Sequence, residues 1–212
     1  MANIIFDFDG TLADTLGVTI NIFEQLLRGG KPMPPDEVDR LRGMALWKVG
    51  AELRILPWKV PYLLARGRAK MRRQMKHVDI FPGMAEAVRQ LDADGHKLYI
   101  LSSNSVRNIR PFLKRFGLQT EFIKVVGGAG VFGKRRKLKR FVKTNSLDPN
   151  ETYYIGDEVR DIDAAHHAGI KAIAVTGGYN NEQALREHKP DFVAKQPGEI
   201  SMIVATNGPA GY

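Results

Sequence analysis

The stretch Ile4-Ile5-Phe6-Asp7-Phe8-Asp9-Gly10-Thr11-Leu12 decides the fold of this chain. A short apolar run that ends in acidic residues and a Gly-Thr turn predicts a buried strand over residues 4–8. In open α/β sheets, ligands bind just beyond the carboxyl ends of the strands. Asp7 and Asp9 are therefore the first candidates for chemistry.

Short β-branched or aromatic runs recur along the chain and alternate with helical patterns. The further strands are predicted over residues 97–101, 122–126, 152–155, 171–175 and 191–194. Helical spacing of apolar residues occurs over 84–91, 106–116, 138–144 and 161–168. Strands that alternate with helices form βαβ units, so the sequence predicts an α/β fold with a parallel sheet.

The segment over residues 15–81 follows the first strand and contains no predicted strand. Prolines punctuate it, and Pro35 and Pro57 stand where helices can begin. We expect an α/β core, residues 1–14 and 82–212, with a helical insert over 15–81. The last residues, 205–212, show no periodicity and are expected to fray.

The composition excludes several classes of protein. The 212-residue chain is 43% hydrophobic and has no cysteine, which rules out a disulfide-stapled scaffold and cysteine-based metal sites. No run approaches the roughly 20 apolar residues of a membrane-spanning helix, and the first residues do not resemble a secretory signal. We expect a cytoplasmic protein without a membrane partner.

The net charge of +9 is concentrated in two segments, 54–76 and 134–143, which contain Lys and Arg but no acidic residue. Each basic segment also has apolar residues at helical spacing. We interpret the basic side chains as the solvent-facing sides of helices, so a nucleic-acid partner is not expected. Whether the chain is a monomer or a homodimer stays open.

Polar residues also follow two other predicted strands. Ser102-Ser103-Asn104 comes after one strand, and Gly156-Asp157-Glu158-Val159-Arg160-Asp161 comes after another. Lys134 begins the helical segment that precedes the latter strand. Because the carboxyl ends of parallel strands lie at one edge of a sheet, these residues are expected to line one crevice.

Four carboxylates, those of Asp7, Asp9, Asp157 and Asp161, would then lie close together. Two unit charges about 4 Å apart repel by roughly 4 kcal/mol at an effective dielectric constant of about 20. Either protons or a cation must offset this repulsion, and Mg²⁺ favours carboxylate oxygens together with a substrate phosphate. Lys134 and a serine hydroxyl would complement the phosphoryl oxygens, so the set indicates phosphoryl transfer.

The ordered set resembles the four motifs of the haloacid dehalogenase-like phosphohydrolase superfamily. These motifs are Asp7-x-Asp9-Gly10-Thr11-Leu12, Ser102, Lys134 and Gly156-Asp157-x-x-x-Asp161. The insert over residues 15–81 resembles a C1-type cap in placement and size. The resemblance implies a Rossmann-like, three-layer α/β core and a phosphatase similar to phosphoglycolate phosphatases, acting on a small phosphorylated metabolite.

The resemblance also implies a mechanism in two steps. Asp7 attacks phosphorus to form an aspartyl phosphate, which water then hydrolyses. Asp9 donates a proton to the leaving oxygen and later activates the water, while Ser102 and Lys134 hold the phosphoryl oxygens. Since the dehalogenating members of the superfamily lack an acid at the position of Asp9, a dehalogenase is disfavoured.

The same resemblance implies which residues support the metal. Mg²⁺ would be bound by the carboxylates of Asp7 and Asp157 and by the backbone carbonyl of Asp9. Asp161 would orient Lys134, and Glu158 would lie behind the metal ligands. Arg42, in the insert, is a candidate for substrate contact.

Some alternatives remain open. Ser102 is preferred as the phosphate-binding serine because it directly follows the strand, but Ser103 is its neighbour, and Asn104 belongs to the same phosphate-binding segment. A mutase similar to β-phosphoglucomutase would return the phosphoryl group to the substrate instead of to water. A binding module that uses its basic insert to hold a phosphorylated ligand or nucleic acid is the alternative outside the enzymes.

Overall fold

The computed structural model describes residues 1–128, 130 and 133–207. Its centre is a six-stranded sheet with the order β3-β2-β1-β4-β5-β6, in which every neighbouring pair is parallel. The strands are β1 (Asn3–Phe6), β2 (Lys97–Leu101), β3 (Phe122–Val126), β4 (Thr152–Gly156), β5 (Lys171–Val175) and β6 (Phe192–Ala194). Because β1 lies between β2 and β4, their carboxyl ends are neighbours, and the predicted parallel α/β sheet is confirmed.

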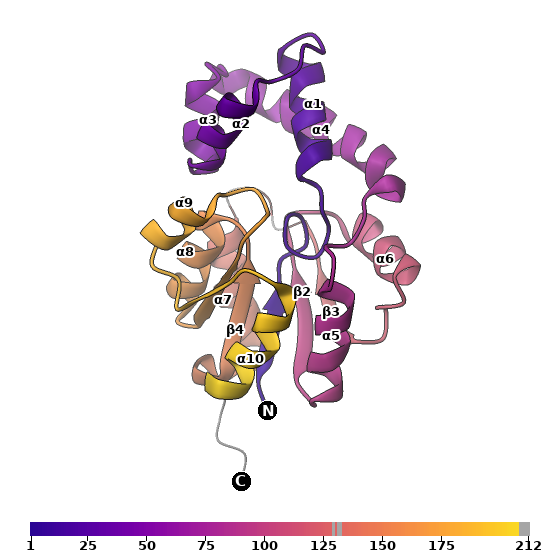
Figure 1. Ribbon diagram of the computed structural model, residues 1–212, viewed down its shortest axis with the longest axis vertical. Coiled ribbons are helices and arrows are strands. Elements are labelled where there is room, and N and C mark those ends of the chain that lie inside the picture. The colour runs from indigo at the N-terminus through magenta and orange to yellow at the C-terminus, as the bar shows by residue number, and fades with distance from the viewer. Residues whose placement is uncertain (129, 131–132, 208–212) are drawn as a thin grey trace.

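Helices cover both faces of the sheet and make three layers (Figure 1). Alternate residues of a strand point to opposite faces, so Ile4 and Phe6 belong to one apolar cluster and Ile5 to the other. The first cluster includes residues of α5 (Met84–Ala93), α6 (Val106–Arg115) and α10 (Pro197–Asn207). The second includes residues of α7 (Lys134–Thr144), α8 (Val159–Ala168) and α9 (Glu182–Glu187).

Residues 15–81 form a helical insert beyond the carboxyl end of the sheet (Figure 1). Its helices are α1 (Leu16–Leu27), α2 (Pro35–Arg42), α3 (Leu46–Glu52) and α4 (Val60–Gln74), with 3-10 turns η1 (Pro57–Lys59) and η2 (Met75–His77). A third 3-10 turn, η3 (Pro149–Glu151), precedes β4 in the core. Pro35 begins α2 and Pro57 begins η1, as the proline positions predict.

The two chain crossings between the core and the insert lie side by side. Ala13 and Ile80 form an antiparallel bridge. The Asp14 N–H donates to the Asp79 carbonyl at 2.9 Å, and the Phe81 N–H donates to the Leu12 carbonyl at 3.1 Å. The insert is therefore attached to the core through one short two-stranded neck.

The elements differ from the sequence prediction in a few places. β1 ends at Phe6 instead of Phe8, because the Phe8 carbonyl accepts from the Leu12 and Ala13 N–H groups and closes a turn there. Residues 205–207 belong to α10, contrary to the frayed tail expected from residue 205. The Asn207 carbonyl accepts a bond from the Tyr153 hydroxyl at 2.7 Å, which holds this end. Residues 208–212 of that tail lie outside the described part of the chain.

Within the described residues, no helix is both long and apolar enough to span a membrane.

Candidate active site

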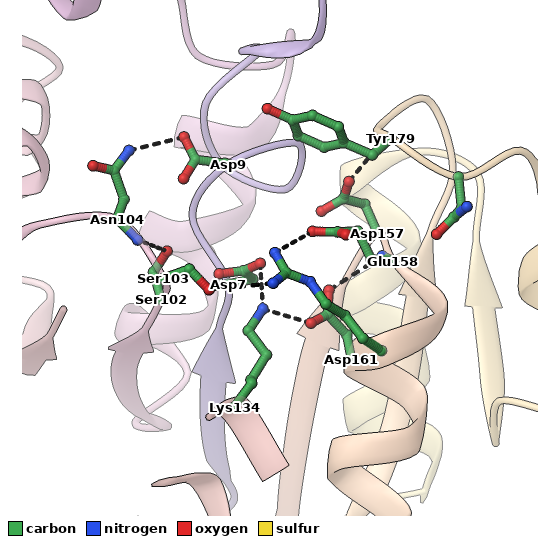
Figure 2. A network of polar contacts seen from close by, with 12 residues as sticks. Asp7, Asp9, Ser102, Ser103, Asn104, Lys134, Asp157, Glu158, Asp161 and Tyr179 are labelled. Carbon is green, nitrogen blue, oxygen red and sulfur yellow. Dashed lines mark hydrogen bonds and ion pairs between the residues drawn. The ribbon is translucent and has the colours of Figure 1, made fainter. Parts of the chain in front are cut away.

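The carboxyl ends of β1, β2 and β4 bring the candidate residues into one buried cluster (Figure 2). Asp7 directly follows β1, and its N–H donates to the Ile155 carbonyl at 2.8 Å, which extends the pairing with β4. Ser102 directly follows β2 and donates its N–H to the Val126 carbonyl at 2.9 Å. Both side chains are almost fully buried, with 1% exposure. Their positions are fixed by the sheet itself.

Lys134 links two of the carboxylates. It begins α7, and its Nζ donates to Asp7 Oδ2 at 2.6 Å and to Asp161 Oδ1 at 2.5 Å. Burial by itself lowers the pKa of Lys134, but the charges of Asp161 and Asp7 outweigh this and raise the pKa well above its ordinary value. The side chain is 2% exposed and remains an ammonium group between two acids.

Asp161 is held from a second side by the start of its own helix. Its Oδ2 accepts the Glu158 N–H at 3.1 Å, and the two residues form a capping box at the N-terminus of α8. Gly156 packs against this carboxylate so closely that a Cβ there would lie 2.4 Å from Asp161 Oδ2. A glycine is therefore required where β4 passes Asp161.

Three acidic side chains meet next to Lys134. One carboxylate oxygen from each of Asp7, Glu158 and Asp161 lies within 4.8 Å of the others, and all three residues are buried. Asp7 Oδ1 is also buried and has no hydrogen-bond partner among the described residues. Clustered carboxylate oxygens of this kind fit a hard cation such as Mg²⁺.

Asp157 faces a different direction from this cluster. Its Oδ1 accepts from the Thr11 hydroxyl at 2.8 Å, and its Oδ2 accepts from the Tyr179 N–H at 2.7 Å. A Cβ on Gly10 or Gly178 would lie 2.1 or 2.3 Å from Asp157 Oδ2, so glycines enclose the carboxylate. Burial and then the nearby acids raise the pKa of Asp157 well above its ordinary value. Glu158, and not Asp157, therefore supplies the third oxygen next to Asp7, and metal binding by Asp157 stays a prediction.

Asp9 lies on the other side of Asp7, toward Asn104 (Figure 2). Asp9 Oδ1 accepts a hydrogen bond from Asn104 Nδ2 at 2.9 Å. Burial, followed by the charge of Asp7, raises the pKa of Asp9 from 3.8 to about 7. A carboxyl group with a pKa near neutrality is suited both to donate and to accept a proton.

The segment after β2 separates the roles of its two serines. Ser102 Oγ lies inside the turn and accepts the Asn104 N–H at 3.1 Å. Ser103 is less buried, and its hydroxyl donates to the Gly130 carbonyl at 3.3 Å. This arrangement favours Ser102 as the hydroxyl at the base of the site, while its phosphate-binding role stays a prediction.

Comparison with known proteins agrees with this geometry. Residues 4–175 match the family model of haloacid dehalogenase-like hydrolases. This chain belongs to that family. It is 36% identical over 206 residues to a phosphoglycolate phosphatase of Synechococcus elongatus, which covers 96% of this chain and 97% of that protein.

Solved structures show the same fold as this haloacid dehalogenase-like hydrolase. A haloacid dehalogenase-like family hydrolase from Streptococcus pneumoniae aligns with a TM-score of 0.78 and 21% identity, over 96% of this chain and 98% of that one. A hydrolase from Pseudomonas syringae aligns with a TM-score of 0.76 and 22% identity, over 99% of this chain and all (100%) of that one.

The hydrolase site also contains Arg160, for which the sequence predicted no role. Arg160 Nη2 donates to Glu158 Oε1 at 2.5 Å, and its Nη1 donates to Ser103 Oγ at 3.4 Å. Burial alone lowers the pKa of Arg160, but the charges of Glu158, Asp161 and Asp7 raise it above its ordinary value. The feature of the sequence that could have identified Arg160 is its position as a basic residue between Glu158 and Asp161 of one motif.

Arg42 of the insert contacts the core beside this site. Its Nη2 donates to the Gly178 carbonyl at 3.0 Å, and its Nη1 lies 3.6 Å from Asp39. Arg42 Nε is buried and has no hydrogen-bond partner within the described residues. Arg42 thus lies next to the loop that encloses Asp157, and its contact with substrate stays a prediction.

Proposed function

We propose that this enzyme is a Mg²⁺-dependent phosphatase that hydrolyses a small phosphomonoester through an aspartyl phosphate on Asp7. The observation that carries the proposal is the asymmetry of the Asp7 carboxylate. Its Oδ2 is bound by Lys134, whereas its buried Oδ1 has no partner among the described residues. One oxygen is oriented by the ion pair and the other is available as a nucleophile.

In the first step, Asp7 Oδ1 forms a bond to phosphorus while the bond from phosphorus to the ester oxygen breaks. Asp9, whose pKa is raised to about 7, donates its proton to the leaving oxygen. In the second step, the Asp9 carboxylate takes a proton from water as the water oxygen bonds to phosphorus. The bond from phosphorus to Asp7 Oδ1 breaks at the same time, inorganic phosphate leaves, and the Asp7 carboxylate is restored.

The other residues stabilise charge on the transferred group. Lys134 lies 2.6 Å from Asp7 Oδ2, so its ammonium holds the carboxylate whose other oxygen, Oδ1, reacts. Ser102 offers a hydroxyl from the neighbouring strand end, with Ser103 and Asn104 in the same segment. Fixed donors at positions where negative charge accumulates are among the largest contributions to catalysis.

The metal would be held by the carboxylates of Asp7 and Asp157 and by the carbonyl of Asp9, with Glu158 next to them. When bound, Mg²⁺ neutralises negative charge on the phosphoryl group. The buried acidic cluster next to Asp7 supports a cation there, and the choice of Asp157 and the Asp9 carbonyl as ligands follows from the family resemblance. Asp161 keeps Lys134 in place through its 2.5 Å ion pair.

For the substrate, we propose a small phosphorylated carboxylic acid such as phosphoglycolate. The support is the Synechococcus elongatus relative, which is a phosphoglycolate phosphatase and matches nearly the whole chain. We further propose that residues 1–14 and 82–212 form the catalytic core, that residues 15–81 act as its cap, and that the enzyme works in the cytoplasm. Arg42 would then recognise the part of the substrate that the core does not hold.

The test is phosphate release from a panel of phosphomonoesters, including phosphoglycolate and a hexose phosphate, with and without Mg²⁺. We expect Mg²⁺-dependent release, and a loss of at least about 10³-fold in Asp7→Asn. Asp94→Asn, at an exposed position after α5, is the matched control and should retain activity. Isomerised sugar phosphate without phosphate release would assign a mutase instead, and no reaction by the folded protein would favour the binding module.

A further inference from the structure

A single side chain, that of Asn180, joins the helical insert to the helix that carries the acidic residues. Asn180 lies between β5 and α9 and is 4% exposed. Its Oδ1 accepts the Val159 N–H at 3.0 Å, and its Nδ2 donates to the carbonyls of Arg42 at 2.8 Å and Met44 at 2.9 Å. The side-chain amide therefore uses its acceptor and both of its N–H donors.

Two of these three partners, those of Val159 and Arg42, are backbone groups at helix ends, which the helices themselves leave unsatisfied. Val159 is the first residue of α8, and Arg42 is the last residue of α2 in the insert. The Asn181 N–H adds a second bond to the Arg42 carbonyl at 3.1 Å. Asn180 thus completes one helix end in the core and one in the insert at the same time.

The loop that contains Asn180 also holds Asp157. The Tyr179 N–H donates to Asp157 Oδ2 at 2.7 Å, and the Asn180 N–H donates to the Asp157 carbonyl at 3.3 Å. The Tyr179 hydroxyl also contacts the insert at the start of α1, 2.9 Å from Thr15 Oγ1 and 2.7 Å from Thr19 Oγ1. The residues that contact Asp157 are therefore themselves bonded to the insert.

We propose that Asn180 is a positioning residue that couples docking of the helical insert to the placement of Asp157 and the start of α8. The inference rests on the proposed function only in giving Asp157 a part in catalysis. With the insert docked, the amide fixes both helix ends, and the site is complete. With the insert displaced, the two carbonyls withdraw, and the loop that holds Asp157 loses its outer support.

Asn180→Asp tests this with little change in shape. A carboxylate keeps the acceptor for the Val159 N–H but faces the Arg42 and Met44 carbonyls with an oxygen instead of a donor. Asn181→Asp is the matched control, since it adds the same charge to the same loop. The Asn181 side chain accepts the Ala184 N–H at 3.0 Å, and an aspartate preserves this bond.

Docking can be measured directly because the chain has no cysteine. Ala51→Cys and Glu187→Cys place spin labels at exposed positions on α3 and α9, one on the insert and one on the core. Double electron–electron resonance should give a narrow distance distribution in the labelled parent and in Asn181→Asp. In Asn180→Asp, we expect a broader distribution that extends to longer distances.

Kinetics supply the second measurement. We expect kcat/KM of Asn180→Asp to fall about tenfold or more, with a higher Mg²⁺ concentration at half-activation and an unfolding midpoint close to that of the parent. An unchanged distance distribution in folded Asn180→Asp would overturn the proposal, whatever its activity. If Asn180→Asp does not fold, Asn180→Ala takes its place, because it removes the donors to the Arg42 and Met44 carbonyls and keeps the Tyr179 N–H that binds Asp157. An unchanged distribution in that variant would then overturn the proposal. A parent without phosphatase activity would refute the proposed function, whereas the distances would still decide the docking.

Discussion

The sheet and the helical insert are held in place by different means. β1, β4 and β5 consist largely of fully buried residues, and the apolar sides of helices cover the sheet on both faces. In the insert, α2 and α4 have no fully buried residue, and α1 has only Ile22. Close packing therefore fixes the residues at the ends of the strands. The insert is held by fewer apolar contacts with the core, such as those of Val18 and Met75, together with polar contacts. The candidate catalytic residues therefore lie on the most closely packed part of the molecule.

The largest effect is expected from breaking the buried ion pairs of Lys134 with Asp7 and Asp161. Lys134→Met should destabilise the protein by about 3–5 kcal/mol, because it leaves Asp7 and Asp161 buried without their cation. It should also lower kcat by at least about 10²-fold. Urea unfolding and phosphate release are the measurements.

Lys139→Met, at an exposed position on the same helix, is the control and should change neither quantity. Because buried acids without a cation take up protons, the loss of stability in Lys134→Met should be smaller at pH 5 than at pH 8. A variant as stable as the parent at pH 8 would contradict this account of the cluster.

A smaller difference should separate equivalent apolar substitutions in the two regions. Leu98→Ala, in a fully buried position of β2, should lower the free energy of unfolding by about 3 kcal/mol. Leu64→Ala, in a partly exposed position of α4, should lower it by about 1 kcal/mol. Chemical denaturation measures both, and equal losses would show that the insert is packed as tightly as the sheet.

An effect smaller than the difference between the two leucine variants should come from Mg²⁺ binding to the acidic residues at the strand ends. At ten times its dissociation constant, a ligand adds about 1.4 kcal/mol of stability, which corresponds to about 3–6 °C in Tm. Burial raises the pKa of Asp9 from 3.8 to about 7, so the metal-free protein loses stability as the pH rises between these values. The Mg²⁺-induced rise in Tm should therefore be larger at pH 8 than at pH 5.5. Thermal unfolding with Mg²⁺ or with a chelator checks this, and a larger rise at pH 5.5 would contradict it.

Much of the core could be predicted from the sequence because strand and helix periods are local. The bounds of β2, β3 and β5 agree with the apolar runs, and the parallel order places Asp7, Ser102 and Asp161 together. The direction of each side chain beyond a strand end could not be predicted. It depends on turn geometry, which turns Asp157 toward Thr11 and Glu158 toward Asp7.

The contacts between the core and the insert could not be predicted from the sequence either. Asn180 lies in a short polar loop without periodicity. Its partners in the insert are the backbone carbonyls of Arg42 and Met44, which are 138 and 136 residues away in the sequence. Because these partners are backbone carbonyls, the residue types at their positions do not indicate the contact with Asn180. The loop became visible as part of the site only when the tertiary structure placed it between Asp157 and the insert.

The paired crossings at Ala13 and Ile80 make the insert an exchangeable module. Both points at which the chain passes between the core and the insert lie in one short neck, and the strands and Asp7 lie outside it. A different helical segment could be grafted between these two points with its own recognition surface while the sheet order is kept. If residues 15–81 act as the cap, as proposed, new substrate preferences can arise by replacement of one continuous piece of chain, without a change in the candidate catalytic residues.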